Sequence, residues 1–140
     1  MSRISITMDS TSENISFARV AVAAFITPLD PTVDEISDIK TAVSEAVTNA
    51  VIHGYPTEVG QVLLDLHAQD KTVTIEITDN GVGIADIDTA RLPLHTTKED
   101  MERSGLGFTV MESFMDSVAV ESSSGKGTKI TLTKTLASQE

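Results

Sequence analysis

Apolar residues recur at every second position in five short runs, and this period constrains the fold more than any other feature of the chain. Alternation with a period of two is typical of a β-strand with one buried face. Gln69-Asp70-Lys71 separates the second run from the third and is short enough for a hairpin turn, and Gly125-Lys126-Gly127 predicts a second hairpin. The alternating positions are Ile4, Ile6 and Met8; Val62, Leu64 and Leu66; Val73, Ile75 and Ile77; Val118 and Val120; and Ile130 and Leu132.

The apolar period changes to that of an α-helix in three further segments. The first helix is capped by Thr11 or Ser12 and runs to about Thr27. Thr32 and Glu35 have capping-box spacing at the start of the second, which closes at 53–56 with Gly54 suited to a left-handed cap. Gly105-Leu106-Gly107 opens the third. The predicted buried stripes are Ile15, Ala18, Val22 and Phe25; Val33, Ile36, Ile39, Val43, Val47 and Ala50; and Val110, Met111, Phe114 and Met115.

Five strands and three amphipathic helices predict an α+β fold, a two-layer sandwich. The 140 residues fit one domain, 1–140. Residues 85–104 have no apolar period, and such a stretch in a compact domain is usually a functional lid or a disordered segment.

Charge and composition limit the classes of partner and site that the chain can have. Ten basic residues against 21 acidic ones give a net charge of -11, which repels phosphate backbones and argues against nucleic acid as a direct partner. The absence of cysteine excludes disulfides and thiolate metal sites. No apolar run approaches the roughly 20 residues of a membrane helix, and the first residues are unlike a signal peptide. We therefore expect a cytoplasmic protein that does not enter a membrane.

Glu45 and Asn49 lie one turn apart on the second predicted helix. At about 100° per residue they share a face that points more than roughly 150° away from Val43 and Val47. The spacing alone is typical of a solvated face. However, Asn is a poor helix former, its oxygen suits Mg²⁺, and a neighbouring carboxylate can accept a proton from a hydroxyl.

Asp79-Asn80-Gly81-Val82-Gly83 ends the third predicted strand. An Asn-Gly turn needs no ligand to explain it. A strand-end carboxylate also accepts hydrogen bonds from an exocyclic amine, and two glycines let a flat ring approach the backbone. The segment lacks the third glycine of a dinucleotide fingerprint, since Asp86 occupies that position.

Arg103-Ser104-Gly105-Leu106-Gly107 precedes a helix, and a glycine-rich helix N-terminus presents free amides to an anion. Lys98 and Arg103 add positive charge in an acidic chain. Gly125-Lys126-Gly127-Thr128 is not a P-loop, because Gly127 stands where Ser or Thr belongs; a hairpin turn explains it, with Thr128 offering a hydroxyl.

Together, in this order, these four segments resemble the Bergerat-type ATP-binding family shared by gyrase B, Hsp90, histidine kinases and MutL. The resemblance covers roughly residues 45–128 and implies a mixed, mainly antiparallel sheet of about five strands with three helices on one face. It implies that ATP or ADP binds with Mg²⁺ and that residues 85–104 are the ATP lid.

The chain is also similar, nearly end to end, to the anti-sigma F factors of spore-forming bacteria. The segments that carry this similarity are Ser12-Glu13-Asn14, Phe17-Ala18-Arg19-Val20, Val43 to Ala50, Thr96-Thr97-Lys98 and Glu102-Arg103-Ser104-Gly105. That family consists of dimeric serine kinases that phosphorylate an anti-anti-sigma protein and, with ATP bound, hold sigma factor F away from RNA polymerase. His95 departs from the family, where an aromatic Phe is expected, and this concerns the packing of the lid.

The resemblance implies a role for each matched residue. Glu45 is the base for the substrate serine, Asn49 the Mg²⁺ ligand, and Asp79 the reader of adenine beside Thr128. Arg19 contacts both protein partners, which makes their binding mutually exclusive. Gly81 and Gly83 border the ring, and the phosphates are held by Thr97, Lys98, Arg103 and the amides of Ser104, Gly105, Leu106 and Gly107.

Three other functions fit parts of the pattern. A binding module in which ATP only selects the partner-gripping conformation needs no carboxylate base, so Glu45 favours an enzyme. The catalytic domain of a sensor histidine kinase is disfavoured because the chain has no room for a dimerising phosphoacceptor helix. Gyrase-like hydrolysis coupled to DNA is disfavoured by the negative charge.

Overall fold

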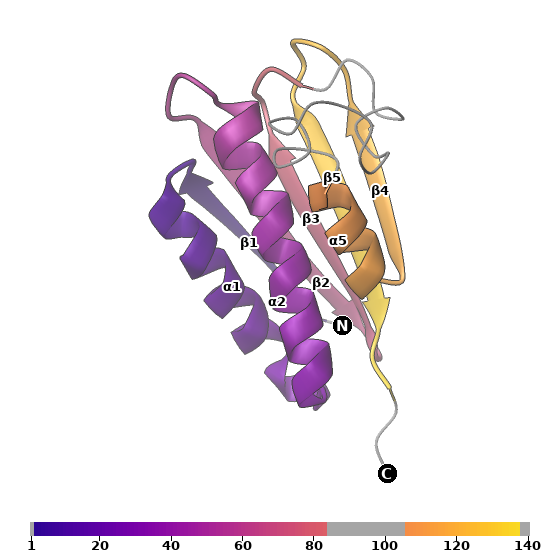
Figure 1. Cartoon of the computed structure of the whole chain (residues 1–140). Coiled ribbons are helices and arrows are strands. Elements are labelled where there is room, and N and C mark those ends of the chain that lie inside the picture. Colours follow the sequence, from indigo (N-terminus) through magenta and orange to yellow (C-terminus); the bar gives the residue numbers. More distant parts are fainter. Residues whose placement is uncertain (1, 84–105, 138–140) are drawn as a thin grey trace.

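The computed structural model describes residues 2–83 and 106–137 and has two layers (Figure 1). The strands form one sheet in the order β1-β2-β3-β5-β4, and every pairing is antiparallel. Helices α1, α2 and α5 cover one face of this sheet. The predicted α+β sandwich is confirmed. The strands are β1 Ser2–Asp9, β2 Gln61–Gln69, β3 Thr72–Asp79, β4 Ser117–Ser122 and β5 Thr128–Thr135.

Alternation along the strands divides the sheet into an apolar and a polar face. In β3 the residues Val73, Ile75 and Ile77 are buried beneath the helices, while the residues between them are half-buried on the open face. Both predicted hairpins form. In the first hairpin turn Asp70 has φ 55, a left-handed backbone conformation that Asp tolerates; Asp30, before α2, has a similar φ of 57. The open face is rich in threonine, as in the cross-strand pair Thr72 and Thr135.

Helix α1 spans Ser12–Ile26 and is followed by the 3₁₀ turn η1, Thr27–Leu29. Thr11 occupies the N-cap position, but its side chain makes no capping hydrogen bond. The buried residues are Ala18, Val22 and Ile26, so the stripe is narrower than predicted; Ile15 and Phe25 are half-buried at its edges. Asp30 then reverses the chain toward α2.

Helix α2 spans Val33–Thr48, and its predicted capping box is present. Glu35 N–H donates to Thr32 Oγ1 at 3.1 Å, and Thr32 N–H donates to Glu35 Oε1 at 2.9 Å. The prediction that Val33 is buried was wrong, because this side chain is 83% exposed. Six residues before the buried Ile39, at about 100° each, Val33 lies about 120° round the helix from the core stripe.

The end of α2 also differs from the prediction. Residues Asn49–Gly54 form a π-helix, η2, and Tyr55 N–H donates to the Ala50 carbonyl at 3.2 Å. Gly54 is not left-handed, since the glycines with positive φ among the described residues are Gly83, Gly125 and Gly127. Another constraint requires glycine at position 54, and it lies in the candidate site.

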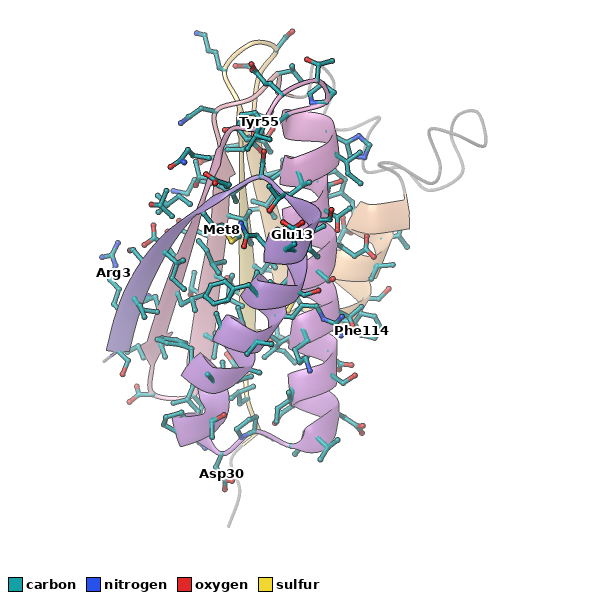
Figure 2. The ribbon with its side chains drawn as sticks, turned by 90° about the vertical axis from the view of Figure 1, so that its left-hand side faces the viewer. Arg3, Met8, Glu13, Asp30, Tyr55 and Phe114 are labelled. Atoms are coloured by element: carbon teal, nitrogen blue, oxygen red, sulfur yellow. The ribbon has the colours of Figure 1, made fainter. Side chains whose placement is uncertain are left out.

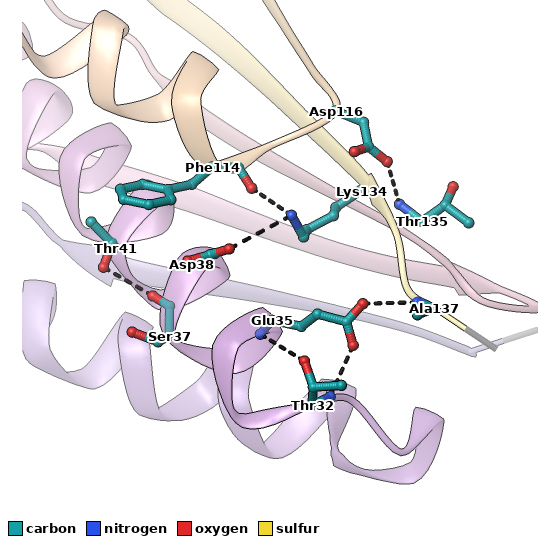
Figure 3. A network of polar contacts seen from close by, with 10 residues as sticks. All are labelled: Thr32, Glu35, Ser37, Asp38, Thr41, Phe114, Asp116, Lys134, Thr135 and Ala137. Carbon is teal, nitrogen blue, oxygen red and sulfur yellow. Dashed lines mark hydrogen bonds and ion pairs between the residues drawn. The ribbon is translucent and has the colours of Figure 1, made fainter. Parts of the chain in front are cut away.

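Helix α5 spans Leu106–Phe114 and packs on α2. Phe108, which the predicted stripe omits, is fully buried, as is Met111. Lys134 of β5 donates to the Phe114 carbonyl at 2.7 Å and lies 4.0 Å from Asp38 (Figure 3). None of the described helices has the length and apolar character of a membrane-spanning helix.

The end of the described chain is tied to the start of α2. Ala137 N–H donates to Glu35 Oε2 at 2.8 Å, so one carboxylate serves the capping box and the residues after β5 (Figure 3). Leu136 is buried and its N–H donates to the Lys71 carbonyl at 2.8 Å. These bonds hold the end of α2 that is remote from Asn49.

Candidate functional site

Asp79, the last residue of β3, carries a buried carboxylate on the helix-covered side of the sheet. Asp79 is 5% exposed, and its Oδ1 accepts a hydrogen bond from Gly81 N–H at 2.9 Å. Burial raises the pKa of Asp79, and hydrogen bonds from the backbone of Gly81 and Thr128 offset part of that increase. Thr128 is the direct cross-strand partner of Asp79, which confirms that the two lie side by side. A carboxylate offers about four lone-pair positions, so Asp79 keeps acceptor capacity for a ligand.

The turn after β3 is fixed through three successive backbone N–H groups. Asn80 N–H donates to the Tyr55 hydroxyl at 2.8 Å, Gly81 N–H to Asp79, and Val82 N–H to the Gly54 carbonyl at 2.9 Å. Two of these three acceptors come from the end of η2. The turn is therefore attached to the helix that carries Asn49.

Steric contacts within the protein explain why glycine occupies positions 54, 81 and 83. A β-carbon at Gly54 would lie 2.9 Å from the Asp79 carboxylate carbon, and one at Gly81 would lie 1.8 Å from the Gly54 carbonyl oxygen. Gly83 has φ +75, and its β-carbon would lie 2.0 Å from the Ser123 carbonyl oxygen. Close contact with the Asp79 side chain accounts for Gly54, and close contact with protein backbone accounts for Gly81 and Gly83. The expected position of Gly81 and Gly83 beside a ligand ring stays a prediction.

The loop between β4 and β5 closes the other side of the Asp79 turn. Gly127 has φ +80, and a β-carbon there would lie 2.2 Å from the Asp79 carbonyl oxygen. Thr128 Oγ1 is 2.7 Å from Ser122 Oγ, and Ser122 also donates to the Gly127 carbonyl at 2.8 Å. Glycine and hydroxyl residues at this turn therefore hold the strand end against the acid.

Glu45 and Asn49 face the start of α5 rather than open solvent. A β-carbon on Gly107 would lie 3.5 Å from Glu45 Oε2 and 3.9 Å from both Asn49 Nδ2 and Oδ1. Glycine at position 107 therefore leaves room in front of the two polar groups. Burial raises the pKa of the Glu45 carboxyl.

The Asn49 side chain is not explained by internal hydrogen bonding. Its Nδ2 is buried and has no hydrogen-bond partner within the part of the chain that the structure describes. A buried amide without a partner costs free energy, and such groups in native proteins usually serve a ligand, ion or water.

Asn49 and Asp79 lie at the same end of the molecule. Asn49 begins η2 and Gly54 ends it, a rise of no more than about 7.5 Å at 1.5 Å per residue. Gly54 then contacts the Asp79 carboxylate directly. Figure 2 shows Tyr55, the next residue, at this end and Asp30 at the opposite end.

The residues present fit an adenine nucleotide with Mg²⁺. Asp79 has free acceptor capacity at one side of η2. At the other side, beside Gly107, the buried Asn49 Nδ2 has no partner among the described residues and can donate to a phosphate oxygen, while its Oδ1 is the kind of hard oxygen that Mg²⁺ prefers. The described residues hold no cluster of three His, Cys, Asp or Glu side chains that could bind a metal alone.

Several predicted site residues fall outside the described ranges. These are Thr97, Lys98, Arg103, Ser104 and Gly105, and the lid as a whole. Leu106 is the first residue of α5 and Gly107 the second, which agrees with a glycine segment opening the helix. The phosphate-binding roles stay predictions.

Arg19 lies apart from this site, exposed on α1. It lines a groove of about 230 Å³ with α2 residues, among them Val33 and Lys40. Arg19 and Lys40 are the single cations of α1 and α2, and neither forms an ion pair with another described residue.

The sequence analysis missed Gly54 and Tyr55 as parts of the site. Gly54 was interpreted as a cap, and Tyr55 was only a residue that closes the helix. The signal available in the sequence was the sole tyrosine of the chain, directly after a glycine.

Comparison with known proteins agrees with this geometry. The family of histidine kinase-like ATPase domains matches residues 8–134. An anti-sigma F factor of Clostridium botulinum (strain Eklund 17B / Type B) is 60% identical over 126 residues, which cover 89% of this chain and 88% of that protein. Those of Clostridium acetobutylicum and Oceanobacillus iheyensis are 58% and 57% identical, covering 90% and 95% of this chain and 88% and 92% of theirs.

A solved structure has the same fold. The crystal structure of the RsbU and RsbW domains of a Mycobacterium tuberculosis protein superposes with a TM-score of 0.72 at 23% identity, over 99% of this chain and 34% of that one. With the matched family spanning the Asn49 helix, the Asp79 turn and both hairpins, the chain belongs to the histidine kinase-like ATPase family and, within it, to the anti-sigma F factors.

Proposed function

We propose that this chain is an ATP-dependent serine protein kinase that phosphorylates an anti-anti-sigma factor and, with ATP bound, binds and inhibits sigma factor F. The observation that carries the proposal is Asn49 Nδ2, a buried donor with no hydrogen-bond partner among the described residues, on the short helix whose end is bonded to the Asp79 turn. The names of the relatives supply the class of partner. Because a sigma factor acts in the cytoplasm, the proposal implies a cytoplasmic protein.

Nucleotide binding is divided between the two ends of η2. The Asp79 carboxylate accepts a hydrogen bond from the exocyclic amine of adenine, with Thr128 beside it. Gly81 and Gly83 border the adenine ring. Asn49 ligates Mg²⁺ through its side-chain oxygen, which is a hard ligand suited to that ion. The phosphates are held by the lid residues Thr97, Lys98 and Arg103 and by the amides of 104–107, at the positive end of the α5 dipole.

Glu45 is the general base. Its carboxylate shares the space before Gly107 with Asn49, and its raised pKa makes it a better proton acceptor than an exposed glutamate. Mg·ATP, when bound, supplies the phosphoryl group. The proton of the substrate serine hydroxyl passes to a Glu45 carboxylate oxygen as the serine oxygen forms its bond to phosphorus, and ADP is the second product.

Protein partners bind on the outer side of the helices. The groove between α1 and α2 presents Arg19 and Lys40, neither of which is ion-paired with another residue of the described ranges, and the 83% exposed Val33 adds an apolar contact. Both the sigma factor and the anti-anti-sigma factor use Arg19, so each displaces the other. Arg19→Ala is expected to weaken both complexes in a pull-down while nucleotide binding is retained; unchanged capture of both partners would exclude this surface.

A second copy of the chain pairs along β1, which is an edge strand of the sheet. Beside it, an apolar groove of about 380 Å³ runs between β1 and α1, with Ile4 46% and Phe17 49% exposed. Edge strands pair readily, and a two-fold axis would bury this groove in both copies. Phe17→Glu should shift sedimentation from dimer to monomer; a wild-type monomer at all concentrations would refute the dimer.

The second candidate function is a non-catalytic module that uses ATP only to grip its partner. Such a module needs Asn49 and Asp79 but no base at position 45. The desolvated Glu45 carboxylate beside Asn49 favours the enzyme.

Phosphoryl transfer from labelled ATP to the purified anti-anti-sigma factor tests the proposal. Glu45→Ala is expected to lower transfer by roughly 10²- to 10⁴-fold while ATP affinity stays within twofold. Glu76→Gln, an acid on the open face of the sheet that pairs with Lys129, is the matched control and should transfer at the native rate. Native transfer by Glu45→Ala would remove the base assignment, and no transfer by the wild type would favour the binding module.

A further inference from the structure

Tyr55 lies between the end of η2 and the Asp79 turn, and the proposed nucleotide contacts do not include it. Its hydroxyl accepts the Asn80 N–H at 2.8 Å and donates to the Gln61 carbonyl at 2.7 Å. The residue is 9% exposed. One hydroxyl therefore connects the start of β2 with the turn that ends β3.

The Tyr55 ring is held in one position by a glycine. A β-carbon on Gly60 would lie 2.1 Å from Tyr55 Cε1, so the ring packs directly on that backbone. Gly60 is in turn bonded to Ser10 in both directions: Ser10 N–H donates to the Gly60 carbonyl at 2.9 Å, and Gly60 N–H donates to Ser10 Oγ at 2.8 Å. The hydroxyl is thus delivered by a rigid side chain.

Three successive N–H groups of the Asp79 turn, those of Asn80, Gly81 and Val82, donate to three different acceptors. Of these acceptors, the Tyr55 hydroxyl is the single side-chain group that comes from outside the turn. The other two acceptors are the Asp79 carboxylate and the Gly54 carbonyl. The Asn80 N–H belongs to the peptide bond that joins Asp79 to Asn80. A shift of this N–H therefore changes the backbone orientation of Asp79 and the direction of its carboxylate. The carboxylate packs so closely on Gly54 that a β-carbon there would lie 2.9 Å from its carbon, so the direction of the carboxylate depends on this backbone.

We propose that Tyr55 is a positioning residue for purine recognition, whose hydroxyl fixes the Asp79 carboxylate at a set distance from Asn49. The inference rests on the proposed function in one respect, that Asp79 accepts the exocyclic amine of adenine. Tyr55 itself touches no ligand and acts through Asn80 and Asp79.

Nucleotide discrimination separates positioning from simple structural support. Inosine triphosphate has an oxygen where adenine has the exocyclic amine, so the ratio of ATP to ITP affinity reports on Asp79. Tyr55→Phe keeps the ring on Gly60 and removes only the hydroxyl. It is expected to weaken Mg·ATP about five- to tenfold, the effect of one lost hydrogen bond, and to leave Mg·ITP unchanged.

Thr72→Val is the matched control. It also removes one hydroxyl hydrogen bond, to Thr135, but at the opposite end of the same strand β3. Calorimetric titration should find both affinities of this variant at wild-type values. A wild-type ATP to ITP ratio in Tyr55→Phe would overturn the positioning role, and so would an equal loss of both nucleotides, which indicates general destabilisation.

Two further outcomes are distinguishable. A wild-type protein that binds ATP and ITP equally refutes the assignment of Asp79, and the role of Tyr55 with it. Because Tyr55 is the sole tyrosine, incorporation of 3-fluorotyrosine gives a single fluorine resonance in the unmutated fold. ATP is expected to shift this resonance more than ITP, and identical responses would contradict the proposal without reliance on any variant.

Discussion

The backbones of Gly54 and Gly81 are in direct contact, although 27 positions separate the two residues. A β-carbon on Gly81 would lie 1.8 Å from the Gly54 carbonyl oxygen, and that oxygen accepts the Val82 N–H at 2.9 Å. At this point the backbone of the helix that carries Asn49 is bonded directly to the turn that carries Asp79. The two halves of the proposed nucleotide site therefore have a fixed spacing.

The first prediction concerns this contact. Gly81→Ala cannot be accommodated unless η2 and the turn separate, so we expect a loss of about 2–4 kcal/mol in unfolding free energy, as for other overpacked sites. The spacing of Asn49 and Asp79 changes with it, and Mg·ATP should no longer raise the melting temperature. Thermal melts with and without nucleotide measure both effects.

Gly125→Ala is the control for the glycine substitution. Gly125 has φ +79 but nothing within 4 Å of the added β-carbon, so only the backbone strain of about 1–2 kcal/mol is expected. Its thermal response to Mg·ATP should match that of the wild type. A Gly81→Ala protein that behaves like Gly125→Ala would mean that the contact is not tight in solution.

Local signals were sufficient for much of the fold and part of the site. The period-two runs identified all five strands, and the Thr32 and Glu35 spacing identified the capping box. The pairing of Asp79 with Thr128 follows the expected order of the motifs. In each case neighbouring residues along the chain carry the physical cause.

The misinterpreted residues depend on contacts between distant segments. Gly54 resembles a helix cap in isolation, and only the approach of Asp79 and Gly81 explains it. The burial of Phe108 likewise depends on the packing of α5 against α2. The π-helix η2 also has no local sequence marker, and the Gly54 carbonyl at its end accepts a hydrogen bond from the N–H of the distant Val82.

The second prediction concerns Asn49. Its Nδ2 is buried and has no partner within residues 2–83 and 106–137, so Asn49→Ala removes a desolvated group as well as packing. We expect the ligand-free protein to keep its stability within about 1 kcal/mol, while affinity for Mg·ATP falls at least tenfold by calorimetry. Full retention of nucleotide affinity would exclude Asn49 as the Mg²⁺ ligand.

The third prediction follows from the raised pKa of Glu45. Burial raises this pKa above its ordinary value of 4.5, so the folded state binds the proton more tightly than the unfolded state does. The corresponding stability is fully present below pH 4.5 and is lost as pH rises through the folded pKa. In Glu45→Gln this loss is absent, and the variant should be at least as stable as the wild type at pH 7.

Urea unfolding at a series of pH values measures the effect, with Glu58→Gln, an exposed loop acid, as the control. Transfer by the wild type should rise with pH through the same window, because the base acts when deprotonated. A Glu45→Gln protein less stable than the wild type at pH 7 would show that the carboxylate is favourably paired in solution.

The fourth prediction concerns Glu35, which joins the start of α2 to the end of the described chain. Burial alone would raise its pKa, but hydrogen bonds from Thr32 and Ala137, together with the charge of Lys134, lower it. A lowered pKa contributes stability above the unfolded value of 4.5 that is lost as pH falls through the folded pKa. Glu35→Ala should therefore cost about 1–2 kcal/mol at pH 7, as for a lost cap, and less in acid.

Asp34→Ala is the matched control, because Asp34 is an acid in the same first turn and has no hydrogen bond to the end of β5. Its removal loses the interaction with the helix dipole, about 0.3–1 kcal/mol, but neither bond that Glu35 accepts. Since Glu35 lies at the end of α2 remote from Asn49, both variants should bind Mg·ATP with native affinity. Equal destabilisation by the two substitutions at pH 7 would mean that the Glu35 bonds to Thr32 and Ala137 add nothing beyond charge. A selective loss of nucleotide affinity in Glu35→Ala would mean that the two ends of α2 are coupled.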